Sequence, residues 1–501
     1  MYGLDPGEPA QVFGRAIWIV AVLFVSCAYF YGGGGWNQDS RIDLVRALVE
    51  QHTLRIDSYQ ENTGDKALFD GHYYSDKAPG IALEAVPFVA AARWIMLAVG
   101  VDSTSPKAVL ALSYLANLFT LAIPLALAAA VLFVVSLRMG SSVDGATFAA
   151  VAVSLATPIW AYATVFFGHT LAGVCLLLSF LAAIELKRFV STNRDFWLAL
   201  AAGLAAGWAT VTEYPAAPAS AIIALLALGN VWSGGWTRRS RVALGIAAGA
   251  LPCAALLVAY QYAAFGSPFS VTYSHYQAGV FPEMNTGFHG LTYPKPLVAL
   301  RLMLDPRLGL LLLAPVIVAA PWGLRSLWKQ GNREVALASG LIFVYFWLLN
   351  ASFYAWNGAW SYGPRYMLAG IPVLCIGLSL VWTECSQPWR RGLIALAACG
   401  IVFTMTAVST TVIPPERFRV PLLQLNARAL LSGRVAISFE SLLVPPRGVD
   451  LRHASFNLGQ LWGLHGFTSL VPLVVFWLIA VVVWKRMQQP AIQPQRWKIA
   501  A

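Results

Sequence analysis

Three charged residues lie at junctions between a polar and an apolar segment of the sequence. At a membrane surface, a carboxylate in such a position can act as a base, and a cation can bind an anionic group. Asp39 follows the first apolar run and could act as a general base or cap the helix that begins after it. Lys77, in GHYYSDKAPG, could hold its ammonium at the height of lipid phosphates or simply pair with headgroups. Arg365, in WSYGPRYML, could bind phosphate through two parallel donors or anchor an aromatic belt.

Two further polar residues lie beside apolar runs. Glu213 stands between two such runs, an expensive place for a carboxylate, which favours a functional role; its partner could be Arg365 or His169. His169 could donate a hydrogen bond or bind a metal, or it could be an ordinary helix-end histidine. The loop FGSPFSVTYSHYQAGVFPEMNTGFHGLTYPKP suits sugar rings or prenyl chains, or it is a structured loop with interface anchors.

The elements that must position these residues belong to a membrane protein. The chain has 501 residues, of which 58% are hydrophobic and 11% charged, whereas about 25% of the residues in a soluble domain are charged. The net charge of +11 does not point to nucleic acid, because the basic residues lie in short loops between apolar runs. Six cysteines without a CxxC pair give no zinc motif. We predict an all-α integral membrane protein.

The apolar runs predict about twelve membrane-spanning helices, since a span needs about 20 residues. We expect residues 78–100, with Glu84, Pro87 and Arg93, to form an interfacial or re-entrant helix instead. The twelve predicted spans lie near residues 13–31, 108–137, 145–165, 169–186, 196–213, 215–231, 242–264, 307–327, 335–354, 366–384, 391–412 and 467–484.

The Lys and Arg residues predict the orientation of these spans. Twelve spans with the N-terminus inside place five basic clusters on the cytoplasmic side, and they put the long loops 32–107, 265–306 and 413–466 outside. The apolar spacing after Asp39 predicts an amphipathic juxtamembrane helix in the first outer loop. We divide the chain into a transmembrane domain (1–412), a small extracytoplasmic segment (413–466), and a last span with a basic tail (467–501). This one-sided distribution of polar residues predicts chemistry on the extracytoplasmic face, in a bacterial inner or plasma membrane.

A family resemblance becomes visible in the first loop. An Asp after the first helix, a surface helix, and then the pattern G-x-x-Y-x-x-K-x-P before an apolar helix resembles the GT-C type of membrane glycosyltransferases, in particular the protein O-mannosyltransferases and the lipid A aminoarabinose transferases. The matching residues are Asp39, Gly71, Tyr74, Lys77, Pro79 and Gly80. The resemblance covers roughly the first half of the chain and continues weakly in WSYGPRYMLAGIP.

This resemblance implies an inverting transferase that moves a sugar from a polyprenyl-phosphate donor to a hydroxyl of a glycan, lipid or protein acceptor. Asp39 would be the base, and Lys77 and Arg365 would bind the donor phosphate. We assign substrate contacts to a further set of residues: Asp43, Tyr74, His169, Glu213 and Tyr362.

The sequence departs from these relatives in two places, and it leaves two other functions open. Many relatives carry an Asp-Glu pair in the first loop where this chain has Asp39-Ser40, and His169 replaces a later carboxylate. We therefore expect no definite cofactor, and a divalent metal stays an open alternative. A transporter or flippase of a lipid-linked saccharide is the main alternative function, although such proteins usually show paired repeats and midplane charges. An inactive relative that assists assembly is a third.

Overall fold

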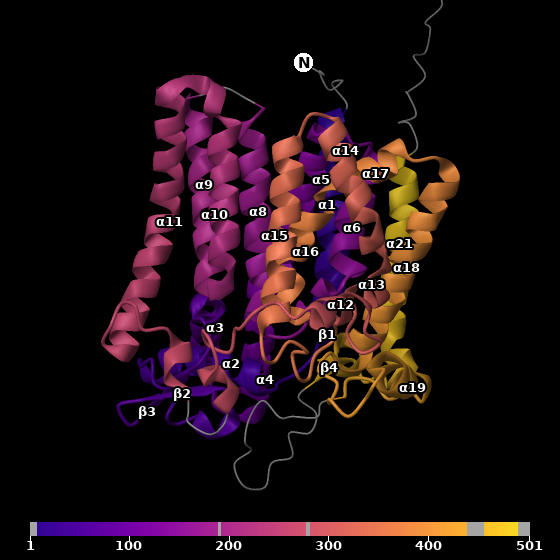
Figure 1. The fold of residues 1–501 in the computed structure, drawn as a ribbon. Helices are drawn as coiled ribbons and strands as arrows, with labels where there is room; N and C mark the ends of the chain where they lie inside the picture. The colour runs from indigo at the N-terminus through magenta and orange to yellow at the C-terminus, as the bar shows by residue number, and fades with distance from the viewer. Residues whose placement is uncertain (1–7, 189–191, 277–280, 438–454, 489–501) are drawn as a thin grey trace, which may run out of the picture.

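The computed structural model describes residues 8–188, 192–276, 281–437 and 455–488. The chain is 74% helical, and its long helices stand side by side in one bundle, with the short strands and most loops gathered at one end (Figure 1). We call this the loop end. The middle of the predicted segment 413–466 and the basic tail beyond residue 488 lie outside the described residues.

Ten helices or helical runs within the described residues are long and apolar enough to cross a membrane, as expected for an all-α membrane protein. They are α1 (Glu8–Ala28), α3 (Gly80–Ala98), the run of α4 (Pro106–Asn117) and α5 (Ile123–Arg138), α8 (Gly168–Leu186), α9 (Thr192–Thr212), α11 (Gly235–Phe265), α15 (Arg333–Ser352), the run of α16 (Ile371–Leu374) and α17 (Leu378–Glu384), α18 (Gln387–Thr410) and α21 (Val471–Gln488).

Nine of the twelve predicted spans coincide with these long helices, and two coincide with the shorter apolar helices α6 (Val143–Leu155) and α10 (Ala217–Asn230). The span predicted at 307–327 is broken. It consists of α13 (Leu310–Leu313), a 3-10 turn and α14 (Ala320–Lys329). Pro315 begins the turn and Pro321 opens α14, and neither residue has the N–H that would carry a continuous helix through this region.

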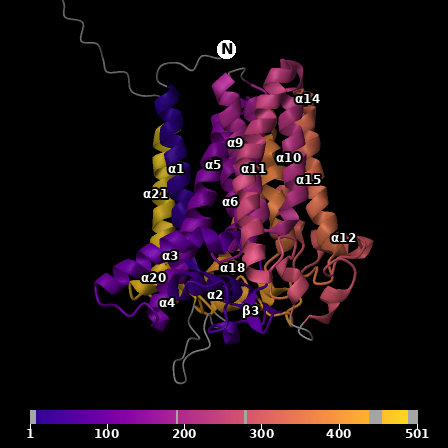
Figure 2. The ribbon, with the colours of Figure 1, turned by 90° about the vertical axis from the view of Figure 1, so that its left-hand side faces the viewer.

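Helix α3 corresponds to the segment 78–100. It passes a test of length and composition for a membrane span. However, both ribbon views place it at the loop end of the bundle together with α4 and α2 (Trp36–Gln51) (Figures 1 and 2). Its last turns expose Trp94, Ile95 and Leu97, which suits contact with lipid near the interface. That this helix is interfacial or re-entrant stays a prediction.

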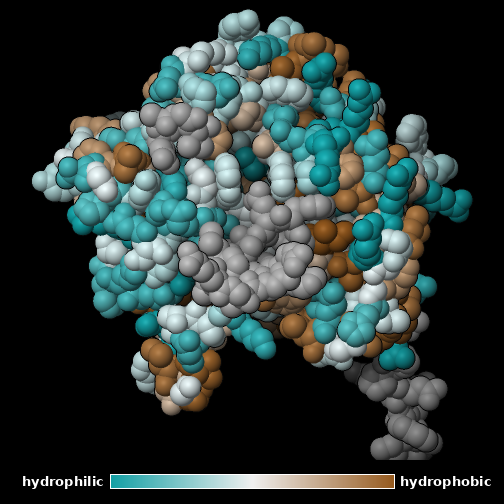
Figure 3. Space-filling view, turned by 90° about the horizontal axis from the view of Figure 1, so that it is seen from below, coloured by the Kyte–Doolittle hydropathy of each residue, from teal (hydrophilic) through white to brown (hydrophobic). Residues whose placement is uncertain are grey.

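The remaining elements of the loop end are short. A hairpin of β2 (Lys66–Phe69) and β3 (His72–Ser75) turns at Asp70 and Gly71, which both have positive φ, as the tightest hairpin turns require. The others are β1 (Phe30–Tyr31) paired with β4 (Phe456–Asn457), α7 (Pro158–Tyr162), α12 (Pro296–Leu304), α19 (Arg428–Leu431) and α20 (Leu458–Leu461). Seen from this end, much of the visible surface is hydrophilic (Figure 3).

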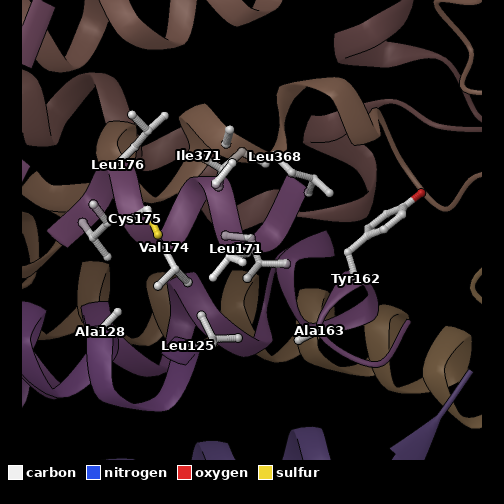
Figure 4. Close-up of a cluster of buried hydrophobic side chains, with 14 of the residues drawn as sticks. Leu125, Ala128, Tyr162, Ala163, Leu171, Val174, Cys175, Leu176, Leu368 and Ile371 are labelled. Atoms are coloured by element: carbon white, nitrogen blue, oxygen red, sulfur yellow. The ribbon is translucent and has the colours of Figure 1, made fainter. Parts of the chain in front are cut away.

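Helix α8 forms the centre of the core. Almost all of its residues are buried, and Figure 4 shows it between α5, which contributes Leu125 and Ala128, and the segment of Leu368 and Ile371. A helix packed on all sides is held in one position, because each side chain fills space between its neighbours. The first residues of α8, which lie at the loop end, are therefore held in a fixed position.

The basic clusters lie at the opposite end of the bundle. They belong to the last turns of α8, α14 and α21 and to the first turns of α11 and α18, all of which point away from α2, β2 and β3 (Figure 1). The described members of the five basic clusters thus lie at the end of the bundle opposite the long loops, which is the separation predicted from the sequence.

Candidate active site

A pocket of about 380 Å³ opens at the loop end, within the size range of small-molecule sites. It is lined both by polar groups and by aromatic and apolar side chains. The polar and charged residues are Asn37 and Arg41 of α2, Lys77, His169 of α8, Glu213, His289 and Asn350 of α15. The tyrosines are Tyr214, Tyr273, Tyr276, Tyr345 and Tyr366.

Lys77 lies at the pocket because strand β3 ends at Ser75, only two residues before it. The carbonyl of Asp76 accepts a hydrogen bond from the hydroxyl of Thr272 at 2.8 Å, which fixes the segment between β3 and α3. The Nζ atom of Lys77 lies 2.8 Å from Asp65 and 2.9 Å from Asp76, and the lysine side chain is 11% exposed. Burial lowers the pKa of Lys77, but the two carboxylates outweigh it and raise the pKa above the usual value. The ammonium is therefore charged, and with two carboxylate partners it keeps a third N–H for a ligand.

Three helices meet at the carboxylate of Glu213. Nη2 of Arg41 donates to its Oε1 at 2.8 Å, and Nδ1 of His169 lies 3.2 Å from the same oxygen. A Cβ atom on Gly168 would lie 2.3 Å from this oxygen, so only glycine allows the approach. Because a buried carboxylate is stable only when it is paired, this contact ties α2 and α8 to the end of α9, which stops at Thr212.

Arg365 lies beside the pocket rather than in its wall. Its Nη2 atom donates to the hydroxyl of Tyr366 at 2.9 Å, and its guanidinium stands 5.3 Å from the ring centre of Phe167. Within the described residues, it forms no ion pair with a carboxylate. Its guanidinium lies next to Tyr366, which does line the pocket.

The apolar wall of the pocket comes from two neighbouring helices of the bundle. Pro215 contributes from the 3-10 turn before α10, Pro218 from the first turn of α10, and Phe346 and Leu349 from α15. The hydroxyl of Tyr345 on α15 donates to the carbonyl of Pro215 at 2.8 Å, which holds the two helices together. A ligand with a polar head and a hydrocarbon chain would find both of its environments in this one pocket.

The two predicted carboxylates of α2 lie on its other side. Each residue turns the helix by about 100°, so Asp39 points about 200° away from both Asn37 and Arg41. It is buried near Tyr31 of β1, whose pKa is raised by burial and by the charge of Asp39. Asp43 accepts a hydrogen bond from Asn62 at 2.9 Å. The structure therefore separates both residues from the pocket.

The base role of Asp39 stays a prediction, but its alternative role as a helix cap is wrong. Helix α2 begins at Trp36, and Gly35 occupies the capping position. The helix starts earlier than the apolar spacing indicated, and Asp39 lies in its first turn, where the helix dipole favours a negative charge.

Two predicted tyrosines pack in the protein interior. The ring of Tyr74 lies 5.2 Å from that of Phe265. Tyr362 is buried, and its N–H donates to the carbonyl of Val412 at 3.2 Å. Of the eight residues assigned from the sequence, all of which the structure describes, Lys77, His169 and Glu213 thus line the pocket.

Sequence reasoning missed Arg41, Asp65, Asp76 and Asn350. The serine at position 40, where many relatives have a carboxylate, was the signal that could have pointed to Asp76. The Ser40 hydroxyl donates to Oδ1 of Asp76 at 3.2 Å, and a carboxylate at position 40 would face a like charge. Both amide atoms of Asn350 lack a hydrogen-bond partner among the described residues, although the residue is buried. The signal for Asn350 was its polar amide inside an apolar run that predicts a membrane helix.

The described residues form no cluster that could hold a metal ion by protein ligands alone. Within the described part of the chain, no group of three or more His, Cys, Asp or Glu side chains lies close enough together to hold one. His169 and Glu213 would supply two ligands, but Arg41 already shares the Glu213 oxygen. We therefore derive no step through a metal.

Comparison with known proteins gives similarity to solved structures but no matching family model and no matching curated protein. ArnT from Cupriavidus metallidurans in the apo state has a TM-score of 0.48 and 18% identity, over 84% of this chain and 71% of that one. The structure of the same ArnT bound to undecaprenyl phosphate gives 0.48 and 16%, over 86% and 72%. The archaeal oligosaccharyltransferase AglB from Archaeoglobus fulgidus, in complex with an inhibitory peptide and a dolichol-phosphate, gives 0.45 and 12%, over 82% and 57%. At these scores the functional conclusion must rest on the pocket itself.

Proposed function

We propose that this protein is an inverting glycosyltransferase that moves a sugar from a polyprenyl-phosphate donor to an acceptor hydroxyl at the extracytoplasmic face of the membrane. The acceptor is a glycan, a lipid or a protein. The observation that carries the proposal is the mixed lining of one pocket, to which Lys77 contributes together with the apolar residues Pro218 of α10 and Phe346 and Leu349 of α15.

The polar part of the lining suits the phosphate of the donor. Lys77 has one N–H left for a phosphate oxygen, and Arg365 stands next to the pocket without a carboxylate partner among the described residues. Cations placed where the phosphate departs stabilise the negative charge that develops there. A sugar phosphate is already a competent leaving group, so the enzyme needs no general acid for this step.

The apolar part of the lining suits the prenyl chain. Pro215, Pro218, Phe346 and Leu349 present only hydrocarbon and ring surfaces, which a chain buries at a gain of about 25 cal/mol per Å². The amide of Asn350 offers a donor and an acceptor, and the rings of Tyr273 and Tyr276, which also line the pocket, offer faces for a sugar. We assign the sugar to these three residues.

The reaction that follows is a single displacement. The acceptor oxygen attacks the anomeric carbon, the bond from that carbon to the phosphate oxygen breaks, and polyprenyl phosphate leaves with the electron pair. A base must take the proton of the acceptor hydroxyl. The basic helix ends opposite the loop end support an extracytoplasmic position of the pocket, because basic residues favour the cytoplasmic side.

The test is a transfer assay with the full-length protein in lipid nanodiscs. A panel of polyprenyl-phosphate sugars is supplied with glycan, lipid and peptide acceptors, and mass spectrometry follows both the glycosylated acceptor and the released polyprenyl phosphate. Lys77→Ala removes a charged hydrogen bond worth about 1.5–3 kcal/mol, so we expect a rise of roughly 10- to 150-fold in the KM for the donor.

Lys66→Ala is the matched control, because Lys66 lies on β2 in the same loop and its Nζ atom donates to the carbonyl of Gln60 instead. We expect this variant to keep the KM of the wild type. If no donor is consumed and lipid-linked sugar crosses the membrane of sealed vesicles, the protein is a transporter. Equal KM values for Lys77→Ala and the wild type would remove Lys77 from the donor site.

A further inference from the structure

His169 has one ring nitrogen engaged and one unoccupied at the wall of the pocket. It is the second residue of α8 and is 8% exposed. Its Nδ1 atom lies 3.2 Å from Oε1 of Glu213. Its Nε2 atom has no hydrogen-bond partner among the described residues, although His169 lines the pocket. A buried polar atom without a partner is costly, so this nitrogen is placed for a ligand.

The partner of Nδ1 decides what Nε2 can do. Glu213 is paired with Arg41 at 2.8 Å, and an ionised carboxylate can only accept hydrogen bonds. Nδ1 must therefore carry the hydrogen. In the neutral ring, Nε2 then carries a lone pair, and this buried nitrogen belongs to a residue that lines the pocket. The same division of roles orients histidine bases in other enzymes, where a carboxylate holds the opposite ring nitrogen.

We propose that His169 is the general base of the transfer, and that Glu213 is the residue that positions it. This inference rests on the proposed function. The proton of the acceptor hydroxyl passes to Nε2 while the acceptor oxygen bonds to the anomeric carbon and the phosphate leaves with its electron pair. The products are the glycosylated acceptor, polyprenyl phosphate and an imidazolium, which returns its proton to solvent.

The position of Asp39 supports this assignment. Asp39 points about 200° around α2 from Asn37 and Arg41, which line the pocket, whereas His169 lines the pocket itself. A base must come within hydrogen-bond reach of the proton it takes. Of the two residues, His169 is the one that lines the pocket, so it is the one that an acceptor bound there can approach.

Several charged and titratable groups face His169 and will shape its response to pH. Glu213 lies at the end of α9, Arg41 comes from α2, and Arg365 and Tyr366 come from the segment before α16, with the Tyr366 ring 5.4 Å from the imidazole. The departing phosphate adds negative charge to the same pocket at the moment when the imidazolium forms.

The test uses the full-length protein in nanodiscs and the lipid-linked sugar that the panel identifies as a substrate. His169→Asn is the main variant, because an Asn amide can still donate to Glu213 from the position of Nδ1 but has no atom at Nε2. His169→Gln is the second variant. His275→Gln is the control, since His275 bonds to Ser270 at 2.6 Å outside the pocket wall.

We expect both His169 variants to lower kcat by roughly 10²- to 10⁴-fold and to lose the fall in kcat toward acid pH that protonation of the base causes. Binding of undecaprenyl phosphate, measured separately, should stay within about threefold, and His275→Gln should match the wild type. The unfolding temperature of each variant in detergent shows that it has folded.

The inference is overturned if the His169 variants keep the wild-type kcat and its fall toward acid pH. It is also overturned if Asp39→Asn loses this fall and the His169 variants keep it. A wild-type kcat that falls toward alkaline pH, with the fall lost in the His169 variants, would make His169 a proton donor and overturn it as well. A wild type that transfers no sugar from any donor removes the proposed function, and the inference with it.

Discussion

Replacement of Arg41 by methionine should destabilise the protein more than any comparable change on α2. The Arg41 side chain is 2% exposed and that of Glu213 is 9% exposed, so the substitution leaves a buried carboxylate without its cation. Breaking one side of a buried ion pair costs about 3–5 kcal/mol. Arg41 also donates to Asn37 at 3.1 Å and to the carbonyl of Ala78 at 3.4 Å, and the latter bond ties α2 to the segment of Lys77.

Arg46→Met is the matched control on the same helix. Arg46 pairs with Glu50 one turn away at 2.9 Å and lies 4.1 Å from the ring centre of Tyr59. Both side chains of this pair are also largely buried, at 13% and 9% exposed, but Glu50 keeps a hydrogen bond from the hydroxyl of Tyr59 at 2.9 Å when Arg46 is removed. We therefore expect a smaller loss of stability than for Arg41→Met, which also breaks the bond to the carbonyl of Ala78.

The assay is the free energy of unfolding from SDS titration in mixed micelles, followed by tryptophan fluorescence. The double variant Arg41→Met/Glu213→Met should regain much of the stability that Arg41→Met loses, because removing both charges leaves no unpaired one. If Arg41→Met loses no more stability than Arg46→Met, the contact between Arg41 and Glu213 does not hold the site together, and our reasoning about its burial is refuted.

Three further predictions follow from single contacts. Gly168→Ala should separate α8 from Glu213, because the new Cβ would lie 2.3 Å from the carboxylate oxygen; we expect a fall in kcat with little change in the KM for the donor, measured by sugar transfer. Asn350→Leu should raise the unfolding temperature, since it removes two buried amide atoms without partners among the described residues, and should raise the KM for the donor; a lower unfolding temperature with an unchanged KM would contradict this. Burial raises the pKa of Asp43 well above its usual value, against the opposing effect of the Asn62 hydrogen bond. Its contribution to stability is therefore present in acid and lost as the pH rises through the folded-state pKa, so unfolding temperatures from pH 5 to 9 should fall with pH more steeply for the wild type than for Asp43→Asn.

The membrane helices could be predicted from the sequence because each is a run of apolar residues long enough to cross a bilayer. Lys77, His169 and Glu213 could be predicted as neighbours because each stands at the end of an apolar run, and all three ends come to the same face. The break in the span at 307–327 was also signalled, by Pro315 and Pro321, but a run of apolar residues hides it when only hydropathy is counted.

The faces of α2 could not be predicted in the same way. Arg41 and Asp39 are two charged residues of one segment that looks amphipathic. The neighbouring sequence does not indicate which of the two side chains points toward α8 and α9. Residues 38–45 are all buried, so α2 has no exposed face to orient it, and its rotation is set by the contact of Arg41 with Glu213, 172 positions away. By contrast, the hairpin that delivers Lys77 was signalled by Asp70-Gly71 between two apolar stretches.

The most direct test of the central claim is an experimental structure of the protein in nanodiscs with undecaprenyl phosphate. We predict the phosphate within hydrogen-bond distance of Nζ of Lys77, and the prenyl chain along Pro218 and Phe346 between α10 and α15. A lipid bound instead in the apolar groove that Gly203, Gly207 and Ile246 help to line between α9 and α11, with its phosphate away from Lys77, would contradict the account.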